Sequence, residues 1–578
     1  MRGDPSRISP VRPIWLVVIS IVIVWSALGG LLSRIQFSRT LENLNVATAL
    51  ECRRDGHWLN PTLEGQPRTK KPPLTAWITA LAMTPKTVQE CSSPNAAIRA
   101  NAFSWLAWES RWPALAQACG GLIAIFFLGC MIGDAWTAAA ASLLAASSYL
   151  FLRYAQVSQT DVSLMLWVTV ANALLAMAIV RRRWWPGMIG GGAAIGLAFM
   201  AKGPVALVQT AVPWIVWKLL ADRRSRWPIA PMLAGIGAFL LVALPWYVLE
   251  FLHDPHRQLK IWFDEVTGSD APDRGEPIFQ YLLYMLEFFP PLLFAIPAAW
   301  QAFHHRKQNG SSHRLLMMIC LVLTPLIVMS FFKDKKDRYL LPMIGPIAIL
   351  AATGLKDWQP KKHSTTSEAP HAYAGLSPTA QTRLQATYWL AIAAVPITFT
   401  LLAALGWPST FRGTNGNPWL SWPIAAGGVL VSALILIATL RSAGNYAALF
   451  TLLFLAIFMH LLTLGYYFHS ASGRSKMLPL ANRIWAKYPN AKVFTTMPFG
   501  SRASEDLSIY MNRTTGWITT DQMNRLLPST DPVVVLMRLR QSDPPIKLSA
   551  PWQTLLTFPK ELGESWRAVV LPPQPMQK

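Results

Sequence analysis

The chain of 578 residues is too apolar for an ordinary soluble protein, because 52% of its residues are hydrophobic and only 14% are charged, where a soluble domain carries about 25% charged residues. Its formal net charge of +23 is spread over short loops between apolar segments, which is typical of membrane topology and argues against a nucleic-acid-binding surface. The composition therefore predicts a polytopic membrane protein.

Apolar segments of membrane length recur along the chain. The first follows a basic stretch, Met1 to Pro13, and is too long for a signal-peptide core, so we expect it to stay in the membrane as a signal anchor. In chain order the segments are Ile14–Leu32, Ala114–Gly133, Ala135–Leu152, Val162–Val180, Pro186–Met200, Val205–Leu220, Pro228–Leu249, Ile278–Ala302, Leu315–Phe332, Tyr339–Leu355, Thr387–Gly406, Trp422–Leu440 and Tyr446–Tyr466. They predict about thirteen transmembrane helices.

Basic residues occupy every second short loop, as the positive-inside rule demands. With the amino terminus in the cytoplasm, the loops on the outer side are Leu41–Met83, Arg153–Asp161, Ala201–Pro204, His253–Pro277 and Lys333–Arg338, together with the carboxy-terminal tail. The loop Lys333–Arg338 is basic although it lies outside. Either it binds an anionic partner such as a phosphate, or it contacts lipid headgroups while Asp334 and Asp337 offset its charge.

The composition changes after Tyr466, where alternating apolar residues predict short strands. These are Ala491–Phe494, Val533–Leu536, Thr554–Phe558 and Arg567–Leu571, with a short helix at Ser501–Asn512. We expect a transmembrane domain over residues 1–470, with amphipathic helices in a large outer loop at 33–112, and a small periplasmic α/β domain over 471–578. The tail contains no glycine-rich nucleotide loop.

Acids at the outer ends of the predicted helices are the first candidates for chemistry, because an unpaired carboxylate there costs several kcal/mol. Glu42 follows the first apolar segment, and Asp161 begins the fourth. If the two loops converge, one acid takes a proton from an acceptor hydroxyl while the other orients it. The alternative for each acid alone is a helix cap or an ion pair with a nearby arginine.

Cations at outer helix ends are the second group, since arginine and lysine bind phosphates at the bilayer surface. A lone lysine there is usually a snorkelling anchor, but here cations stand in several separate outer loops. The predicted donor-phosphate site comprises Lys71, Lys202, Arg274, Arg338 and Tyr339. Candidates for the acceptor pocket are Trp58, Lys70 and Glu265.

The five cysteines give little framework. Cys119, Cys130 and Cys320 lie in apolar segments, where cysteine is an ordinary buried residue. Cys52 and Cys91 both fall in the first outer loop, and a disulfide between them is open at this point. No CxxC or HExxH metal pattern occurs.

Several phrases resemble the polyprenyl-phosphate-dependent membrane glycosyltransferases, the family that includes the aminoarabinose transferase of lipid A and the protein O-mannosyltransferases. In chain order they are GHWLNPTLEGQPRTKKPPLTAWITAL, QTDVSL, GLAFMAKGPVAL, LPWYV, RGEPIFQYLLYMLEFFPP and RYLLPMIGPIAIL. The resemblance spans Glu42 to Leu355 and implies a GT-C fold, a lipid-linked sugar donor and inverting transfer to an acceptor on the outer side of the bacterial inner membrane. It also implies that an acid of the first outer loop is the base.

Some family positions are changed. The first-loop Asp-Glu pair of the family reads Leu41-Glu42 here, so Glu42 has to act from the adjacent position. The family positions that resemble a divalent-metal pair hold Lys70 and Val266. We therefore predict no bound metal and no cofactor, in a monomer whose partners are a polyprenyl-phosphate-linked sugar, an envelope glycolipid or protein acceptor, and membrane lipid, without nucleic acid.

Two other functions compete with transfer. The loss of the signature aspartate favours a non-enzymatic role, either as a transporter of lipid-linked sugar or as a degenerate family member with a scaffold role. A membrane anchor for the tail domain would need one helix only, whereas about thirteen predicted helices indicate a function within the bundle.

Overall fold

The computed structural model describes residues 13–37, 40–267, 276–304, 310–357, 475, 477–496, 504–519, 522–523, 531–540, 552–558 and 564–572. These divide into two compact units. The helical unit contains residues 13–30, 114–157 and those from 161 to 357. The sheet unit contains residues 31–113, 158–160 and those from 475 onward. Residues 31–113, which we assigned from the sequence to the transmembrane domain, thus group with the carboxy-terminal residues.

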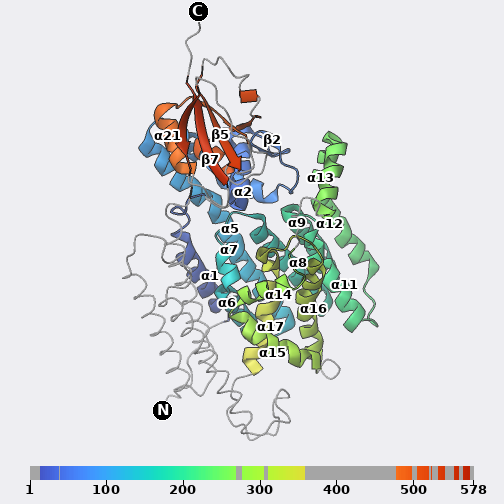
Figure 1. Cartoon of the computed structure of the whole chain (residues 1–578). Coiled ribbons are helices and arrows are strands. Elements are labelled where there is room, and N and C mark those ends of the chain that lie inside the picture. Colours follow the sequence, from blue (N-terminus) through green and yellow to red (C-terminus); the bar gives the residue numbers. More distant parts are fainter. Residues whose placement is uncertain are drawn as a thin grey trace, which may run out of the picture. The chain divides into compact units, whose positions relative to one another are not determined.

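The helical unit consists of helices with short connections (Figure 1). Its elements are α1 (Ile14–Gly29), the second half of α5 (Ala96–Ile132), α6 (Ala135–Ser147), α7 (Tyr149–Tyr154), α8 (Thr160–Val180), α9 (Trp184–Lys202), α10 (Val205–Gln209), α11 (Ala211–Ala221), α12 (Ile229–His253), α13 (Pro255–Thr267), α14 (Gln280–Tyr284), the 3₁₀ helix η1 (Met285–Phe288), α15 (Pro291–His304), α16 (Gly310–Ser330), the 3₁₀ helix η2 (Asp337–Met343) and α17 (Ile344–Asp357).

Five of the described helices are long and apolar enough to cross a membrane, so the chain is a multi-pass membrane protein. Gln280–Phe288 and Pro291–Trp300 are together apolar enough to make a sixth crossing, but they are bent by 112° within the single span predicted at Ile278–Ala302. Two consecutive prolines, Pro290 and Pro291, explain the break, because proline removes a backbone donor and clashes with the preceding turn. The last three predicted spans, Thr387–Gly406, Trp422–Leu440 and Tyr446–Tyr466, lie outside the described residues.

Other predicted spans are shorter or longer in the structure. Ala135–Leu152 is divided between α6 and α7, and Val205–Leu220 between α10 and α11. The helix that contains the span predicted at Ala114–Gly133 begins at Ala96, because α5 has 37 residues. At 1.5 Å per residue such a helix is about 55 Å long, so it extends well beyond a hydrocarbon core of about 30 Å.

Glycines allow α9 and α12 to approach each other closely. A Cβ atom on Gly192 would overlap the carbonyl group of Gly235, and one on Gly235 would lie 2.6 Å from the carbonyl oxygen of Met188. Small residues at helix interfaces let backbones pack together in membranes, where van der Waals contact replaces the hydrophobic effect as the driving force. The glycine-rich phrase of α9 is therefore a packing surface.

The sheet unit begins with the helices of the first loop and a small hairpin. These elements are α2 (Thr40–Asp55), β1 (Thr62–Leu63), β2 (Gln66–Pro67), α3 (Leu74–Ala82), α4 (Pro85–Glu90) and the first half of α5. The expected helices are present. However, α2 is buried on nearly all sides rather than amphipathic, since every residue from Glu42 to Cys52 except Leu44 is buried.

A mixed five-stranded sheet forms the carboxy-terminal part of this unit, and Figure 1 shows its strands in red with α21 (Met477–Lys487) beside them. The strand order is β4 (Gly516–Trp517), β3 (Lys492–Thr495), β5 (Val533–Arg540), β7 (Glu564–Leu571) and β6 (Gln553–Thr557). β3 is parallel to β4 and β5, whereas β7 is antiparallel to β5 and β6.

Both faces of this sheet are covered. Val534 and Leu536 pack with α21 and α22 (Ser504–Met511) in the main core, while Val533 and Val535 point to a second, smaller core. This alternation along β5 is the period of two that a strand imposes. The four predicted strands and the helix at Ser501–Asn512 are confirmed, and α21 and β4 were not predicted.

The close approach of α9 and α12 gives a stability prediction. Gly192→Leu should lower the free energy of unfolding by about 3 kcal/mol or prevent folding, because a backbone carbonyl cannot move aside. Thermal unfolding in detergent measures the effect. Gly237→Leu, on α12, is the matched control, because no atom lies within 4 Å of a Cβ there. Equal melting temperatures for the two variants would contradict this packing.

Candidate functional site

A glycine turn fixes Lys202 at the carboxyl end of α9. Gly203 adopts φ +78°, a conformation that side chains disfavour, and its amide donates to the carbonyl of Phe199. Pro204 then starts the next short helix. Asp161 lies in the first turn of α8, where an acid is stabilised by the helix dipole.

The structure brings Asp161, Lys202, Arg338 and Tyr339 together in the helical unit. The Lys202 ammonium donates to Asp161, and Arg338 Nε lies 3.7 Å from the other carboxylate oxygen. Both cations face the ring of Tyr339, with Lys202 Nζ 3.9 Å and Arg338 Cζ 5.2 Å from its centroid. Gln209 supports this arrangement, since its amide donates to the Tyr339 carbonyl at 2.7 Å.

We call these four residues the Asp161 cluster. Asp161 is 1% exposed and Lys202 is 8% exposed, so both are almost fully removed from water. The cluster contains two cations and one carboxylate. Two neighbouring cations of this kind suit a phosphate group.

A second charged group stands next to it in sequence. Arg153 donates to Asp337 at 2.7 Å and to Glu287 at 3.1 Å, and the Tyr154 hydroxyl donates to the same Asp337 oxygen at 2.8 Å. The backbone amide of Arg338 donates to the other Asp337 oxygen. These contacts fix the start of η2, and with it the two residues that enter the Asp161 cluster.

The basic loop Lys333–Arg338 is partly neutralised within the protein. Lys335 is buried and donates to the carbonyls of Glu276 and Phe332, while Lys336 contacts the carboxylates of Asp334 at 2.9 Å and Glu276 at 3.4 Å. Asp334 therefore offsets part of the charge, as one of the two sequence interpretations required, whereas Arg338 turns toward Asp161.

Glu42 is bound by an arginine in the sheet unit. Arg111 Nε and Nη2 donate to its two oxygens at 2.7 and 3.0 Å, and both side chains are buried. Arg111 also donates to the carbonyls of Leu32 and Ile35. Such a bidentate pair occupies both oxygens of the carboxylate. The backbone amide of Ser158 lies 3.4 Å from Glu42.

Glu42 and Asp161 belong to different units, and each is described within its own, so their convergence stays a prediction. The same holds for Lys71, which lies in the sheet unit apart from the Asp161 cluster. Arg274 lies outside the described residues, and Glu265 falls within α13 but its side chain is not among those described.

The other candidates of the first loop lie on the surface of the sheet unit. Lys70 is exposed, Lys71 is half-buried, and Trp58 packs at the edge of the main core, with its carbonyl accepting a hydrogen bond from the Trp77 indole. Cys52 and Cys91 are both buried free thiols, so the structure contains no disulfide between them. Burial raises the pKa of each thiol to about 12.

One group of the described residues has the composition of a metal site. Ligand atoms of Glu51, Asp55 and His57 lie within 4.8 Å of one another. Glu51, however, already accepts hydrogen bonds from the Thr62 hydroxyl at 2.5 Å and the Glu64 amide at 2.7 Å. Through these contacts Glu51 joins α2 to the β1–β2 hairpin.

A buried acidic pair follows on α22. Glu505 is 0% exposed, and neither of its carboxylate oxygens has a hydrogen bond to another described residue. Burial is the main reason that its pKa rises to about 8. Next to it, Asp506 accepts a hydrogen bond from the Asn43 amide, and burial together with the neighbouring Glu505 raises its pKa as well.

Sequence reasoning missed Arg111 and Arg153, the partners of the acids. Arg111 was hidden because residues 96–113 were assigned to a loop. A signal was available, since an arginine next to the apolar segment that begins at Ala114 needs a partner as much as Glu42 does. Glu505 had no such signal, because its burial depends on packing against α2 and the hairpin.

Comparison with known proteins supports the predicted resemblance. A model of the dolichyl-phosphate-mannose-protein mannosyltransferase family matches residues 97–261. The chain is 30% identical over 174 residues to an undecaprenyl phosphate-α-4-amino-4-deoxy-L-arabinose arabinosyl transferase of Pseudomonas fluorescens, covering 29% of this chain and 30% of that protein. It is 27% identical over 317 residues to one of Shewanella sediminis, covering 52% of each. The chain thus aligns with about half, at most, of the length of these relatives.

The fold has a known counterpart over nearly its whole length. The crystal structure of ArnT from Cupriavidus metallidurans in the apo state matches with a TM-score of 0.71 and 15% identity, covering 96% of this chain and 97% of that one. Its complex with undecaprenyl phosphate matches with a TM-score of 0.68 and 16% identity over the same shares. The predicted resemblance to polyprenyl-phosphate-dependent membrane glycosyltransferases is confirmed, and the fold is that of ArnT.

The Glu42–Arg111 pair gives a second stability prediction. Arg111→Met should cost about 3 to 5 kcal/mol, because it leaves a carboxylate buried without a partner. Glu42→Gln in the same chain should recover much of this loss. Lys86→Met is the control, since Lys86 is 82% exposed and pairs with Glu90 on the surface, where such pairs contribute about 0.5 kcal/mol. Thermal unfolding in detergent measures these differences in stability. If the Arg111→Met protein were as stable as the control, the prediction would be wrong.

Glu505 gives a pH prediction. Because its pKa is about 8 in the folded protein and 4.5 as a model value, the native state keeps a proton that the unfolded chain releases between these values. The free energy of unfolding should therefore fall as pH rises from about 5 to about 8. Glu505→Gln should flatten this slope in melting temperatures recorded across the window. Glu90→Gln, on the surface of α4, should leave it unchanged, and an unaltered slope in Glu505→Gln would refute the assignment.

Proposed function

We propose that this chain is a membrane glycosyltransferase that moves a sugar from a polyprenyl phosphate to a cell-envelope acceptor, a glycolipid or a protein. The Asp161 cluster is the observation that carries the proposal. Its support is the pair of neighbouring cations, Lys202 and Arg338, in a fold that ArnT shares, and the similarity to relatives named for undecaprenyl phosphate-linked aminoarabinose transfer.

In this proposal Lys202 and Arg338 bind the donor phosphate, and the Tyr339 ring holds both cations in place. Lys71 and Arg274 add to the same site from their own loops. A phosphodiester leaving group gains negative charge as its bond to the sugar breaks, so preorganised cations stabilise the transition state more than the ground state. Trp58, Lys70 and Glu265 are proposed to line the acceptor pocket.

Asp161 is the proposed base. In the free protein both of its oxygens face cations, Lys202 and Arg338. A donor phosphate that engages these two cations competes with the carboxylate for them, so the carboxylate can turn to the acceptor hydroxyl when donor is bound. The acceptor hydroxyl oxygen then bonds to the anomeric carbon, its proton passes to Asp161, and the carbon–oxygen bond to phosphate breaks with its electron pair going to the phosphate.

Glu42 is proposed to orient the site rather than to take the proton. The family resemblance assigns the base to the first loop, but the bidentate contact with Arg111 favours a positioning role. The backbone amide of Ser158 also lies 3.4 Å from Glu42, within the sheet unit.

The proposed location is the bacterial inner membrane, with a cytoplasmic amino terminus and a periplasmic carboxy-terminal domain. Support comes from the multi-pass helices and from the alternation of basic loops, which places the residues of the Asp161 cluster on the outer side.

The transfer proposal predicts that Asp161→Asn, Lys202→Met and Arg338→Gln each reduce turnover by about 100-fold or more, the usual effect of losing a general base or a charge-stabilising donor. Purified protein in detergent would be given undecaprenyl phosphate-α-4-amino-4-deoxy-L-arabinose and other polyprenyl-phosphate sugars with glycolipid acceptors, and labelled product counted.

Asp222→Asn is the matched control, because Asp222 also pairs with a lysine, at 3.9 Å, but on a partly exposed helix end. It should keep full activity. Melting temperatures of all variants separate loss of folding from loss of chemistry. Full turnover by folded Asp161→Asn would remove its role as base, and no turnover of any polyprenyl-phosphate sugar by the unmodified chain would end the proposal.

A further inference from the structure

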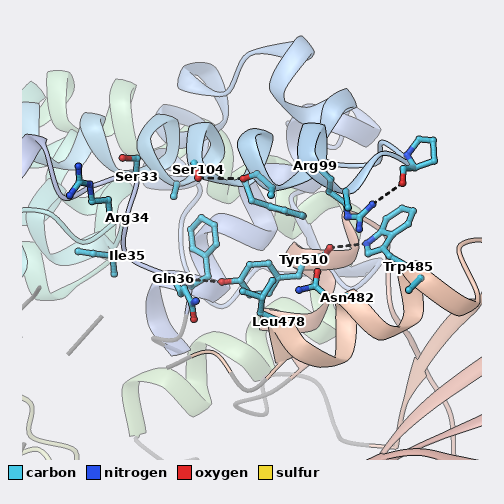
Figure 2. A pocket seen from close by; sticks show the side chains of 17 residues that line it. Ser33, Arg34, Ile35, Gln36, Arg99, Ser104, Leu478, Asn482, Trp485 and Tyr510 are labelled. Atoms are coloured by element: carbon cyan, nitrogen blue, oxygen red, sulfur yellow. Dashed lines mark hydrogen bonds between the residues drawn. The ribbon is translucent and has the colours of Figure 1, made fainter. Parts of the chain in front are cut away.

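A groove in the sheet unit lies apart from the residues assigned to transfer. It has a volume of about 780 Å³ and runs between the first turns of α5 and one face of α21, with the segment Ser33–Phe37 at one end and Tyr510 at its base (Figure 2). From Ala96 to Ala107 the α5 wall extends about 16 Å. This length exceeds a single sugar ring and suits an elongated ligand.

The α5 wall is made mostly of small side chains, Ala96, Ala100, Ser104 and Ala107, which leave the space open. The opposite wall and the rim add amide groups from Asn482 and Gln36. Small and polar side chains beside aromatic ones are typical of sites for amphiphilic ligands.

The charged side chains that line the groove are all positive. Two arginines and no acid are among the residues that line it, and Figure 2 shows Arg34 and Arg99 toward opposite ends. Arg99 is 7% exposed, and among the described residues its guanidinium donates hydrogen bonds to the backbone carbonyls of Ser93 and Pro94. No carboxylate among the described residues pairs with it.

The guanidinium of Arg513 adds to the positive charge at this end of the groove. Arg99 and Arg513 both lie against the ring of Trp485, with Cζ atoms 4.8 and 4.6 Å from its centroid. Arg513 donates only to the Ala491 carbonyl among the described residues. The ring is fixed, because its indole nitrogen donates to the Tyr510 carbonyl. Two cations share one ring without an acid to balance them, so an anion at this end would be stabilised.

Two segments that line the groove adjoin apolar segments in the sequence. Ser33 follows the end of α1 at Gly29 by four residues. The α5 wall belongs to the part of a 37-residue helix that precedes the apolar segment from Ala114. Both features are expected of residues at the level of lipid headgroups.

We propose that this groove binds the phosphate-bearing head of an anionic membrane lipid, with phosphate at Arg99 and polar head atoms along Gln36 and Asn482. The lipid is either the acceptor glycolipid of the transferase, in which case the inference rests on the proposed function, or an anionic phospholipid of the bilayer. Both share the chemistry that the groove offers.

Photo-crosslinking tests the site directly. Full-length protein in nanodiscs would be exposed to diazirine probes of phosphatidylglycerol and of a phosphorylated glucosamine glycolipid, and labelled peptides mapped by mass spectrometry. We expect labelling within residues 33–37 and 96–107. Ala100→Trp should fill the groove and reduce this labelling about tenfold, and Arg99→Gln should do the same through the lost charged contact.

Two neighbours provide matched controls. Asn101→Trp places the same ring on the next, exposed residue of α5, and Lys487→Gln removes an exposed charge from α21; neither residue lines the groove. Both variants should be labelled as strongly as the unmodified protein. Ser104→Trp is a second blocking variant should Ala100→Trp not fold, as judged by its melting temperature.

Labelling by the glycolipid alone identifies the acceptor as the occupant, and labelling by phosphatidylglycerol alone identifies a bilayer lipid. Labelling that is absent, or that Ala100→Trp, Ser104→Trp and Arg99→Gln leave unchanged, overturns the proposal. Because binding is measured without turnover, a chain that transfers sugar but does not label here loses only the groove assignment, while one that labels but transfers nothing loses only the proposed function.

Discussion

A carboxylate buried near the end of a membrane helix must be matched by a cation, and the arrangement of this protein follows from that constraint. Asp161 is matched by Lys202 and Arg338, which ties the start of α8 to the end of α9 and to η2. In the sheet unit Glu42 is matched by Arg111, which ties α2 to α5. Removing one partner would cost several kcal/mol, so each pair fixes the helices that carry it.

The same constraint explains how much the sequence could predict. Charges at the ends of apolar segments need partners, so Asp161, Lys202 and Arg338 could be selected without a structure, and the alternating pattern of Val533–Leu536 identified a strand. The partner of Glu42 was missed, because tryptophans and charges interrupt the hydropathy of residues 96–113 and hide the first half of α5, although Arg111 stands next to an apolar segment. The packing of α22 against α2 joins residues more than 400 apart in sequence, which no local pattern reports.

Matched and unmatched cations suggest two different uses of positive charge. Lys202 and Arg338 already face Asp161, so a phosphate that binds them must compete with a carboxylate, and its arrival changes the contacts of that acid. Arg99 and Arg513 face an aromatic ring instead, which compensates a cation only weakly. An anion that binds there would not displace a carboxylate from either arginine. The first arrangement couples binding to chemistry, whereas the second favours binding alone.

The length of α5 places two arginines with different contacts on one element. Arg99 and Arg111 are twelve residues apart, which on a continuous helix corresponds to about 18 Å of rise and about 120° of rotation. One face of the helix can therefore line the groove while another holds Glu42, without either side chain crowding the other. A helix that merely crossed the bilayer would be too short for this. The extra turns before Ala114 are explained if they exist to carry these two arginines.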